Sequence, residues 1–316
     1  MARNDGSIVI TGAAGFLGSH LCRALLDRGE RIIGVDNMST GRPASLAGIA
    51  DSPGLTLMEG DVSESLNVDT PVKAVVHLAC PASPTAFMRM PIDTLRVGSL
   101  GTLNALALAH ANDARFLFAS SSEVYGDPLV HPQDESYRGN VDPTGPRSVY
   151  DEAKRFGEAA TTAYRRTFGT ATAIVRPFNV YGPGMWPDDG RVVAAFCAAA
   201  LRGQPLKLHG DGKQTRSLCY VDDLIGGLIA LLDSDEAGPL NLGSEDEITM
   251  LDLAERIIAA AGTGRIEFLP PREQDVSVRR PDTSRARRLL SWQPTTSLRS
   301  GLAQTIAWMR SNLPGG

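Results

Sequence analysis

Short apolar runs alternate with helical patterns through the first half of the chain. The runs predict strands in SIVIT, RIIGVD, LTLMEGDV, AVVHLAC, RFLFASSS and TAIVRPFN. Helical patterns lie between them, as in GFLGSHLCRALLDRG and PIDTLRVGSLGTLNALALAHAN. Strands separated by helices imply a parallel sheet with both faces covered, so we expect a doubly wound α/β domain.

The pattern changes after Asn179, where YGPGMWPDDG is rich in Gly and Pro and predicts a loop. Beyond it we expect a helix in RVVAAFCAAALRG, a hairpin in PLKLHGDGKQTRSLCY, helices near 221–232 and 250–261, and a terminal helix. These elements indicate a smaller mixed lobe. The chain is therefore predicted to divide into a domain over 1–178 and a lobe over 179–316, with some segments of the lobe returning to the first domain.

Composition narrows the class of protein. The 316 residues are 42% hydrophobic and carry a net charge of −5, which argues against the basic surface that nucleic-acid binding needs. No apolar run approaches the roughly 20 residues of a membrane-spanning helix. The polar start MARNDGSIVITG lacks the layout of a signal peptide. We expect a cytoplasmic protein without nucleic-acid or membrane partners.

The four cysteines, Cys22, Cys80, Cys197 and Cys219, are widely scattered and form no CxxC pair. That spacing favours reduced thiols over a disulfide framework, and we predict no metal site.

Three glycines, Gly12, Gly15 and Gly18, stand at three-residue spacing between the first predicted strand and helix. Glycine permits a tight turn there and lets backbone approach a pyrophosphate at the helix N-terminus. The spacing is GxxGxxG, which differs from the familiar GxGxxG fingerprint and is weak evidence alone. Asp36, at the end of the second strand, strengthens it, because a carboxylate there can accept hydrogen bonds from an adenosine ribose.

These features predict NAD as cofactor, since the Asp36 carboxylate would repel the extra phosphate of NADP. Arg42 lies nearby and could soften that preference, although we expect a solvated loop arginine. Asp61 would lie near the adenine or act as an ordinary capping aspartate, and His77 is expected to be packed at its strand end. The predicted cofactor-binding residues of this domain are Gly12, Gly15, Phe16, Leu17, Gly18, Asp36, Asn37, Asp61, Val62, Leu78, Ala79, Tyr150 and Lys154.

Tyr150 and Lys154 stand four residues apart in PRSVYDEAKRFGEAA, which places a phenol and an ammonium on one helical face. A phenol with a pKa of about 10 is a poor base at neutral pH. A neighbouring cation favours the phenolate, and an oxidised nicotinamide would add positive charge in the same direction. The pair suits removal of a hydroxyl proton while hydride leaves the same carbon, so we predict an enzyme that oxidises an alcohol, at least transiently.

Together, VITGAAGFLGSHL, Asp36, the Tyr150–Lys154 pair and ASSSEVYGD resemble the extended short-chain dehydrogenase/reductases that act on nucleotide sugars. Within that family, HLACPASP, SEVYGDPLVHPQDESYRGNVDPTGPRSVYDEAKR, DGRVV and GDGKQTRSLCYVDDL look like UDP-glucuronate decarboxylases. The resemblance covers nearly the whole chain. It implies a Rossmann-type sheet with a substrate-binding lobe, tightly bound NAD, and a carbon–carbon lyase that makes UDP-xylose through a C4-keto sugar.

The resemblance also implies roles for the catalytic residues Ser121, Glu123, Tyr150 and Lys154. Ser121 would complete the triad, Tyr150 would be the base at the C4 hydroxyl, and Lys154 would bind the nicotinamide ribose and hold Tyr150 ionised. Glu123 follows Ser122 where related dehydratases carry Asp-Glu, and this Ser-Glu pair is the decarboxylase pattern. Glu123 would act near C5 or polarise a water, although a strand-end carboxylate bound to backbone is an alternative.

Substrate contacts are implied in the same way. Asn179 would contact the diphosphate of a UDP-sugar, and guanidinium groups would clamp its phosphate oxygens. The implied substrate-binding residues are Pro81, Ser122, Asn179, Arg191, Arg216 and Arg279. Phe87, Arg138 and Gly184 depart from the decarboxylase pattern, which commonly has tyrosine, tryptophan and arginine there. These departures put the exact sugar nucleotide in doubt more than the reaction type.

Three alternatives stay open: a nucleotide-sugar 4-epimerase, a 4,6-dehydratase, and a non-catalytic NAD-sensing binding protein. Ser122 argues against the dehydratase, because a serine hydroxyl cannot supply the acid that the leaving C6 hydroxyl needs. An intact Ser121, Tyr150 and Lys154 set argues against the sensor. The resemblance further predicts a homodimer through the Tyr150 helix and the Ala/Leu-rich helix before His110.

Overall fold

The computed structural model describes residues 6–271 and 278–313. Residues 1–5 of the first predicted domain, and 272–277 and 314–316 of the second, lie outside the described residues.

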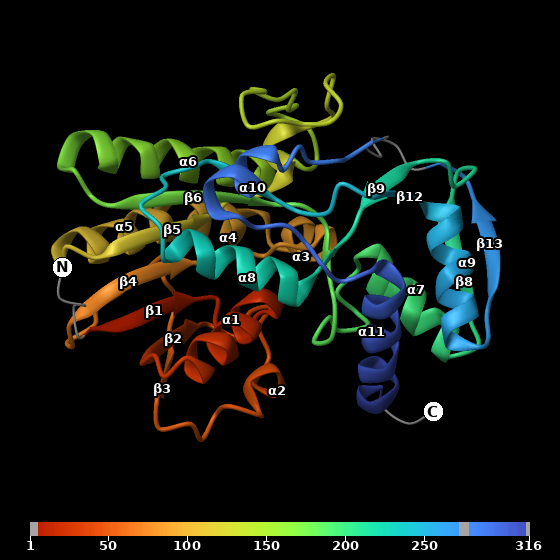
Figure 1. Ribbon diagram of the computed structural model, residues 1–316, viewed down its shortest axis with the longest axis horizontal. Helices are drawn as coiled ribbons and strands as arrows, with labels where there is room; N and C mark the ends of the chain where they lie inside the picture. Colours follow the sequence, from red (N-terminus) through yellow and green to blue (C-terminus); the bar gives the residue numbers. More distant parts are fainter. Residues whose placement is uncertain (1–5, 272–277, 314–316) are drawn as a thin grey trace.

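Seven parallel strands form a central sheet in the order β11-β6-β5-β4-β1-β2-β3 (Figure 1). The strands are β1 Ser7–Thr11, β2 Ile32–Asp36, β3 Leu55–Glu59, β4 Val72–His77, β5 Arg115–Ala119, β6 Thr172–Pro177 and β11 Leu240–Leu242. The first six lie within or beside the six predicted apolar runs, and the prediction of a Rossmann-type doubly wound sheet is confirmed. The strand order reverses between β1 and β4, where the carboxyl ends of parallel strands open a crevice.

Helices cover both faces of this sheet (Figure 1). On one face, α1 (Phe16–Asp27) packs against α8 (Val221–Leu232). On the other lie α4 (Pro91–Arg96), α5 (Thr102–Ala111) and α6 (Ser148–Phe168). Since α8 and β11 come from beyond residue 179, the 179–316 segment contributes to the layers of the sheet as well as to the smaller lobe.

The predicted helix over 91–112 contains a π-helical turn between α4 and α5, at Val97–Gly101. A Cβ on Gly98 would lie 2.4 Å from the Cβ of Ala153, so only glycine lets this turn approach α6 one residue from Lys154. Thr102 donates to the Gly98 carbonyl at 2.8 Å. A π-turn of this kind often marks a functional site, and here it fixes how closely the turn packs on the helix that carries Tyr150.

The smaller lobe lies on the right in Figure 1. Its elements are β8 Pro205–His209, β9 Thr215–Ser217, β12 Glu247–Thr249, β13 Arg265–Leu269, α7 Val192–Leu201, α9 Met250–Ala261 and α11 Leu298–Asn312. The remaining elements are α2 Pro43–Leu46, α3 Pro84–Arg89, the 3₁₀ turn Ser122–Tyr125, β7 Val180–Tyr181, β10 Cys219–Tyr220 and α10 Ser284–Leu290.

The predicted hairpin over PLKLHGDGKQTRSLCY is wrong. β8 pairs in parallel with β13, and β9 pairs antiparallel with β12. The glycines of HGDG do make a turn, with φ of +70° at Gly210 and +75° at Gly212. The buried Leu206 and Leu208 of β8 nevertheless belong to the large core cluster, and the partner strand begins only at Arg265.

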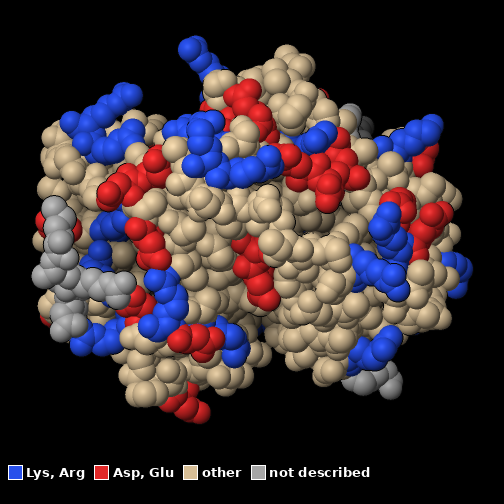
Figure 2. Space-filling view, in the orientation of Figure 1, with Lys and Arg blue, Asp and Glu red and all other residues tan. Residues whose placement is uncertain are grey.

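Acidic and basic side chains are interspersed over the face drawn in Figure 2. Among the described residues, no helix is long and apolar enough to cross a membrane, and no group of three or more His, Cys, Asp or Glu is placed to hold a metal ion. All four cysteines are free.

Candidate active site

A cavity of about 760 Å³ opens at the carboxyl ends of β1, β2, β4, β5 and β6 and extends to β8 in the smaller lobe. This is the crevice in which open α/β sheets bind their ligands. Every predicted site residue lies in its lining, so the fold brings together segments from both halves of the chain. Their individual roles stay predictions.

The glycine turn connects β1 to α1 beneath one end of the cavity. Gly12 has a φ of +74°, and a Cβ there would lie 2.9 Å from the backbone nitrogen of Ala79. A Cβ on Gly18 would lie 2.0 Å from the Gly12 carbonyl oxygen. Gly15 is the N-cap of α1, and no side chain caps that helix end. Free backbone N–H groups therefore face the cavity with the positive end of the helix dipole.

Asp36 is fixed beside this turn by two backbone N–H groups. Ala14 donates to one carboxylate oxygen at 2.9 Å and Met38 to the other at 2.8 Å. Burial raises the pKa of Asp36 above its ordinary value, while these two hydrogen bonds act to lower it. Asn37 and Asp61 both line this end of the cavity, and Asn37 donates a hydrogen bond to Asp61 at 3.0 Å.

His77 and Arg42 both have protein partners. The buried His77 contacts Thr11 at 2.8 Å and Thr102 at 3.2 Å, and burial lowers its pKa to about 3, so it is a neutral packed histidine as expected. Arg42 is a partly exposed loop arginine, as expected, and it also pairs with Asp188 and lies over the Trp186 ring.

Tyr150 and Lys154 lie on α6, facing the strand end that carries Ser121. Both side chains are buried, and Lys154 Nζ donates to the Ala119 carbonyl at 2.8 Å. Lys154 Nζ lies 5.6 Å from the centroid of the Tyr150 ring. The expected helix face is therefore confirmed, with the ammonium anchored to the end of β5.

Burial shifts the pKa values of both Tyr150 and Lys154. Burial raises the pKa of the Tyr150 phenol, and the hydrogen bond with Ser121 and the charge of Arg191 act in the opposite direction without offsetting it. Burial also lowers the pKa of Lys154. The predicted role of Lys154 in holding Tyr150 ionised, together with the positive charge of an oxidised nicotinamide, stays a prediction.

Glu123 sits in the turn after β5 between two arginines. Its carboxylate lies 3.0 Å from a nitrogen of Arg147 and 3.1 Å from a nitrogen of Arg279. Burial alone would raise the pKa of Glu123, but the charges of Arg279 and Arg147 hold it below the ordinary value. Glu123 is therefore ionised, and the alternative of a carboxylate bound only to backbone is wrong.

Arg279 is also anchored at this turn, because it donates to Ser122 Oγ at 3.3 Å and to the Gly126 carbonyl at 2.8 Å. Its predicted role as a phosphate clamp stays a prediction.

Asn179 has two features that suggest ligand binding. It has a φ of +27°, unusual for a residue other than glycine, and its buried side-chain amide nitrogen has no hydrogen-bond partner among the described residues.

The two remaining predicted arginines reach the lining from the smaller lobe. Arg191 pairs with Asp189 and lies 5.4 Å from the centroid of the Phe16 ring. Arg216, on β9, donates to the Thr215 carbonyl at 2.8 Å.

Sequence reasoning missed Arg147 and the position of Phe87. The Phe87 ring stacks on Tyr150 with centroids 5.1 Å apart. The Arg147 guanidinium, which pairs with Glu123, lies 5.5 Å from the centroid of the Phe87 ring. The signal for Arg147 was its place three residues before Tyr150 in GPRSVY. Of the three departures, only Phe87 lines the cavity; Arg138 is exposed and Gly184 lies beside His20.

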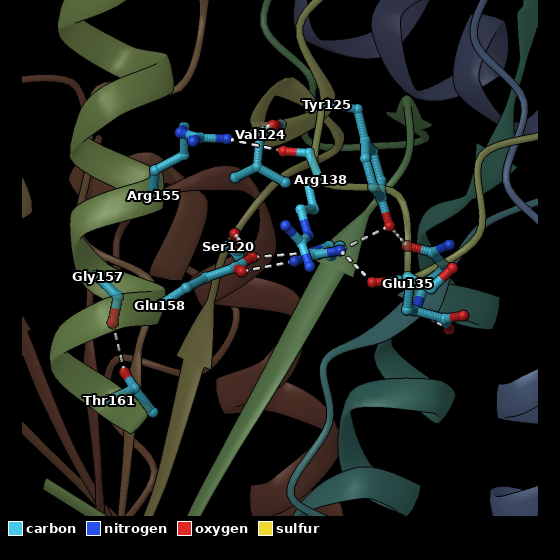
Figure 3. A network of polar contacts seen from close by, with 12 residues as sticks. Ser120, Val124, Tyr125, Glu135, Arg138, Arg155, Gly157, Glu158 and Thr161 are labelled. Carbon is cyan, nitrogen blue, oxygen red and sulfur yellow. Dashed lines mark hydrogen bonds and ion pairs between the residues drawn. The ribbon is translucent and has the colours of Figure 1, made fainter. Parts of the chain in front are cut away.

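A buried polar network holds α6 behind this site (Figure 3). Glu158, one turn beyond Lys154, accepts from Ser120 at 2.6 Å and from two nitrogens of Arg176 at 2.7 and 2.6 Å. Arg176 also donates to the Tyr125 hydroxyl at 2.8 Å, and Tyr125 donates to Asn241 at 2.8 Å. The network joins α6, β5, β6 and β11, and it flanks the turn that carries Ser121 and Glu123 on both sides.

Comparison with known proteins assigns the chain to a family. Residues 8–243 match the model of the NAD dependent epimerase/dehydratase family. The chain belongs to this family.

The chain is similar to individual members of known function. The chain is 47% identical to UDP-glucuronic acid decarboxylase 1 of Arabidopsis thaliana over 309 residues, which are 97% of the chain and 70% of that protein. It superposes on UDP-glucose 4-epimerase of Thermotoga maritima with a TM-score of 0.89, at 28% identity over 98% of the chain and 100% of that structure. The dTDP-glucose 4,6-dehydratase DesIV of Streptomyces venezuelae, solved with NAD bound, gives a TM-score of 0.86 at 27% identity, with 97% of each chain covered.

The cofactor of this family is NAD, and the residues of the chain fit it. Glycine at 12 and 18 lets the backbone of this turn pack closely, since a Cβ at either position would collide with backbone atoms, and the turn leads into the N-terminus of α1, where a pyrophosphate can bind. Asp36 presents a fixed carboxylate where the ribose of NAD is predicted to bind. Lys154 and Tyr150 line the same cavity, where the nicotinamide half is predicted to bind.

Proposed function

We propose that the protein converts UDP-glucuronate to UDP-xylose and carbon dioxide, with NAD as a bound catalyst. The observation that carries this proposal is the ionised Glu123, held between Arg147 and Arg279 directly after Ser122. Similarity over 97% of the chain to a UDP-glucuronic acid decarboxylase supports it.

Tyr150 acts as the base at the sugar C4 hydroxyl, and Ser121 orients its phenol. When bound, NAD would supply the acceptor and later the donor of the C4 hydride, and its oxidised ring would add positive charge. That charge would act together with Arg191 and the Ser121 hydrogen bond against the burial that raises the pKa of Tyr150. Lys154, fixed to the Ala119 carbonyl, is placed to bind the nicotinamide ribose.

Oxidation at C4 places a ketone β to the C6 carboxylate. The bond from C5 to C6 then breaks, its electrons enter the ketone, and carbon dioxide leaves. C5 takes a proton from water, which Glu123 orients because its carboxylate is ionised and accepts hydrogen bonds only. Return of the hydride to C4 and of the proton from Tyr150 completes UDP-xylose, with no net redox change.

The rival activities fit the site less well. A dehydratase needs an acid for the C6 hydroxyl, but Ser122 is a hydroxyl that accepts from Arg279, and Glu123 is ionised. A 4-epimerase has no need of a carboxylate clamped by two arginines beside Ser121. An NAD sensor has no need of a buried tyrosine and lysine set for proton transfer.

We further propose that the protein is a homodimer. Large apolar side chains are exposed on the outer face of the α4–α6 layer, among them Ile92 (66%), Leu100 (47%) and Phe156 (41%). Exposed apolar side chains gathered on one layer are typical of interfaces. The cytoplasmic location stays a prediction from the sequence.

The test is release of labelled carbon dioxide from UDP-glucuronate that carries its label in the C6 carboxylate. The native protein should release it with added or bound NAD. Tyr150→Phe should reduce release by roughly 10²-fold to 10⁴-fold, the usual contribution of a general base, while NAD remains bound. Equal release by Tyr150→Phe would contradict the assignment of the base, and no release by the native protein would contradict the reaction.

A further inference from the structure

Two segments far apart in the sequence meet at the wall of the cavity that carries Asp36. Arg42, six residues after Asp36, donates from one guanidinium nitrogen to both carboxylate oxygens of Asp188, at 2.6 and 2.5 Å. The same guanidinium lies 4.6 Å from the centroid of the Trp186 ring. Trp186 in turn donates from its indole nitrogen to Ser45 Oγ at 3.3 Å. We call the Arg42, Trp186 and Asp188 contact the clasp.

Both halves of the clasp are continuous with the cavity lining. The backbone N–H of Arg42 donates to the Ala14 carbonyl, within the glycine turn, at 3.0 Å. Ser39 and Thr40 precede Arg42 and line the cavity, as Asp189 and Gly190 do after Asp188. The clasp therefore joins the segment that follows Asp36 to the loop 182–190 on the side where the adenosine half of NAD is predicted to lie.

The loop is anchored at two further points. His20, on α1, donates to the Pro183 carbonyl at 2.8 Å. The Trp186 ring meets Trp308 of α11 edge to face, with centroids 5.3 Å apart. These contacts hold the first part of the loop, and Arg42 and Asp188 form an ion pair between its later part and the segment beside Asp36.

The exposure of the clasp suits a contact that opens and closes. The side chains of Arg42 and Asp188 are 39% and 71% exposed, and pairs of this kind contribute little to folding stability. The two contacts of Arg42 with the Asp188 carboxylate, and the Trp186 ring under its guanidinium, nevertheless fix the orientation of the Arg42 side chain. The Arg42–Asp188 pair can therefore open while the other anchors of the loop stay in place.

We propose that Arg42, Trp186 and Asp188 are cofactor-retaining residues, whose contact slows the escape of NAD(H) from the cavity. The biological need for this cofactor retention rests on the proposed function. In a reaction that oxidises C4 and later reduces it, the reduced cofactor has to stay until carbon dioxide has left. Escape at that stage would leave free NADH and a 4-keto pentose.

The experiment measures cofactor escape without any sugar nucleotide, so its result holds whether or not UDP-glucuronate is the substrate. Protein loaded with NADH is mixed with excess NAD, and the loss of NADH fluorescence gives the dissociation rate. Arg42→Gln and Asp188→Asn should each accelerate dissociation about tenfold, equivalent to about 1.4 kcal/mol of lost retention. The double variant should dissociate no faster than either single variant, because both remove the same contact.

Arg28 and Asp233 provide a matched control. They form an ion pair at 2.8 Å with side chains 36% and 54% exposed, away from the cavity lining. Arg28→Gln should leave the dissociation rate unchanged. Unchanged rates in both clasp variants would overturn the proposal. Acceleration by Arg42→Gln alone would overturn it as well, since Arg42 would then act on the cofactor without Asp188.

Discussion

Asp151 follows Tyr150 on α6 and is buried, with one carboxylate oxygen that has no hydrogen-bond partner among the described residues. Burial first, and then the charge of Glu123, raise the pKa of Asp151 from 3.8 to about 7 against the opposing charges of Arg147 and Arg279. Near neutral pH the folded protein therefore keeps a proton there that the unfolded chain has lost.

Asp151→Asn should stabilise the protein in a pH-dependent way. The carboxyl of the folded state binds the extra proton between pH 3.8 and about 7, so the native protein loses stability across that range as pH rises. Relative to it, the variant should gain stability from pH 4 to 7 and keep the gain above, by up to roughly 4 kcal/mol. Unfolding temperatures between pH 5 and 8 measure this.

Asp142 gives the control for that measurement. It is exposed, and hydrogen bonds from Thr144 lower its pKa. Asp142→Asn should therefore show no gain as pH rises. A gain for Asp151→Asn that does not depend on pH would contradict the account of a buried protonated carboxyl.

At the scale of single residues, the sequence predicts most of the site because its signals are local. The glycine spacing, Asp36 and the Tyr150–Lys154 pair each depend on a few neighbouring positions, and all of them line the cavity. Arg147 and Phe87 could not be placed in this way. Their roles come from contacts between α3, α6 and the turn after β5, which no local spacing encodes.

At the scale of elements, α6 is fixed to the sheet by the Glu158–Arg176 pair, whose side chains are only 16% and 10% exposed. Glu158→Gln should cost about 3 kcal/mol, because it leaves the Arg176 guanidinium buried without its counter-charge. It should also lower kcat more than it changes KM, since it loosens the helix that carries Tyr150. Chemical denaturation and steady-state kinetics measure the two effects.

Glu152→Gln is the matched control on the same helix. Glu152 pairs with Arg155 at 3.6 Å, and both side chains are about 40% exposed. An exposed pair of this kind contributes roughly 0–1 kcal/mol. Similar stabilities and similar kcat values for the two variants would contradict a positioning role for Glu158.

Local sequence patterns predict some of the helices and strands but not how all of them pair and pack. The strands of the sheet are predicted because continuous apolar runs are typical of buried parallel strands. The hairpin is mispredicted because HGDG has ordinary turn chemistry, whereas strand pairing in the smaller lobe is decided by distant partners at β12 and β13. The π-turn before Thr102 is equally invisible in the sequence, since it depends on the close approach of Gly98 to Ala153.

At the scale of the whole molecule, the predicted homodimer can be tested through its apolar face. Light scattering should give the mass of a dimer, and Leu100→Arg should shift it to a monomer, because a charge buried in that interface would have no partner. Leu129 is 80% exposed but lies in the loop after β5, outside the helical layer. Leu129→Arg should leave the dimer intact; a monomeric native protein would contradict the prediction.

The central claim is decarboxylation with the hydride returned, and mass spectrometry of the reaction in deuterated water tests it most directly. UDP-glucuronate should give a UDP-pentose lighter by one carbon dioxide, carrying a single deuterium at C5, while no NADH accumulates. A product of unchanged mass with altered retention would contradict the claim in favour of epimerisation. A product lighter by water would contradict it in favour of dehydration.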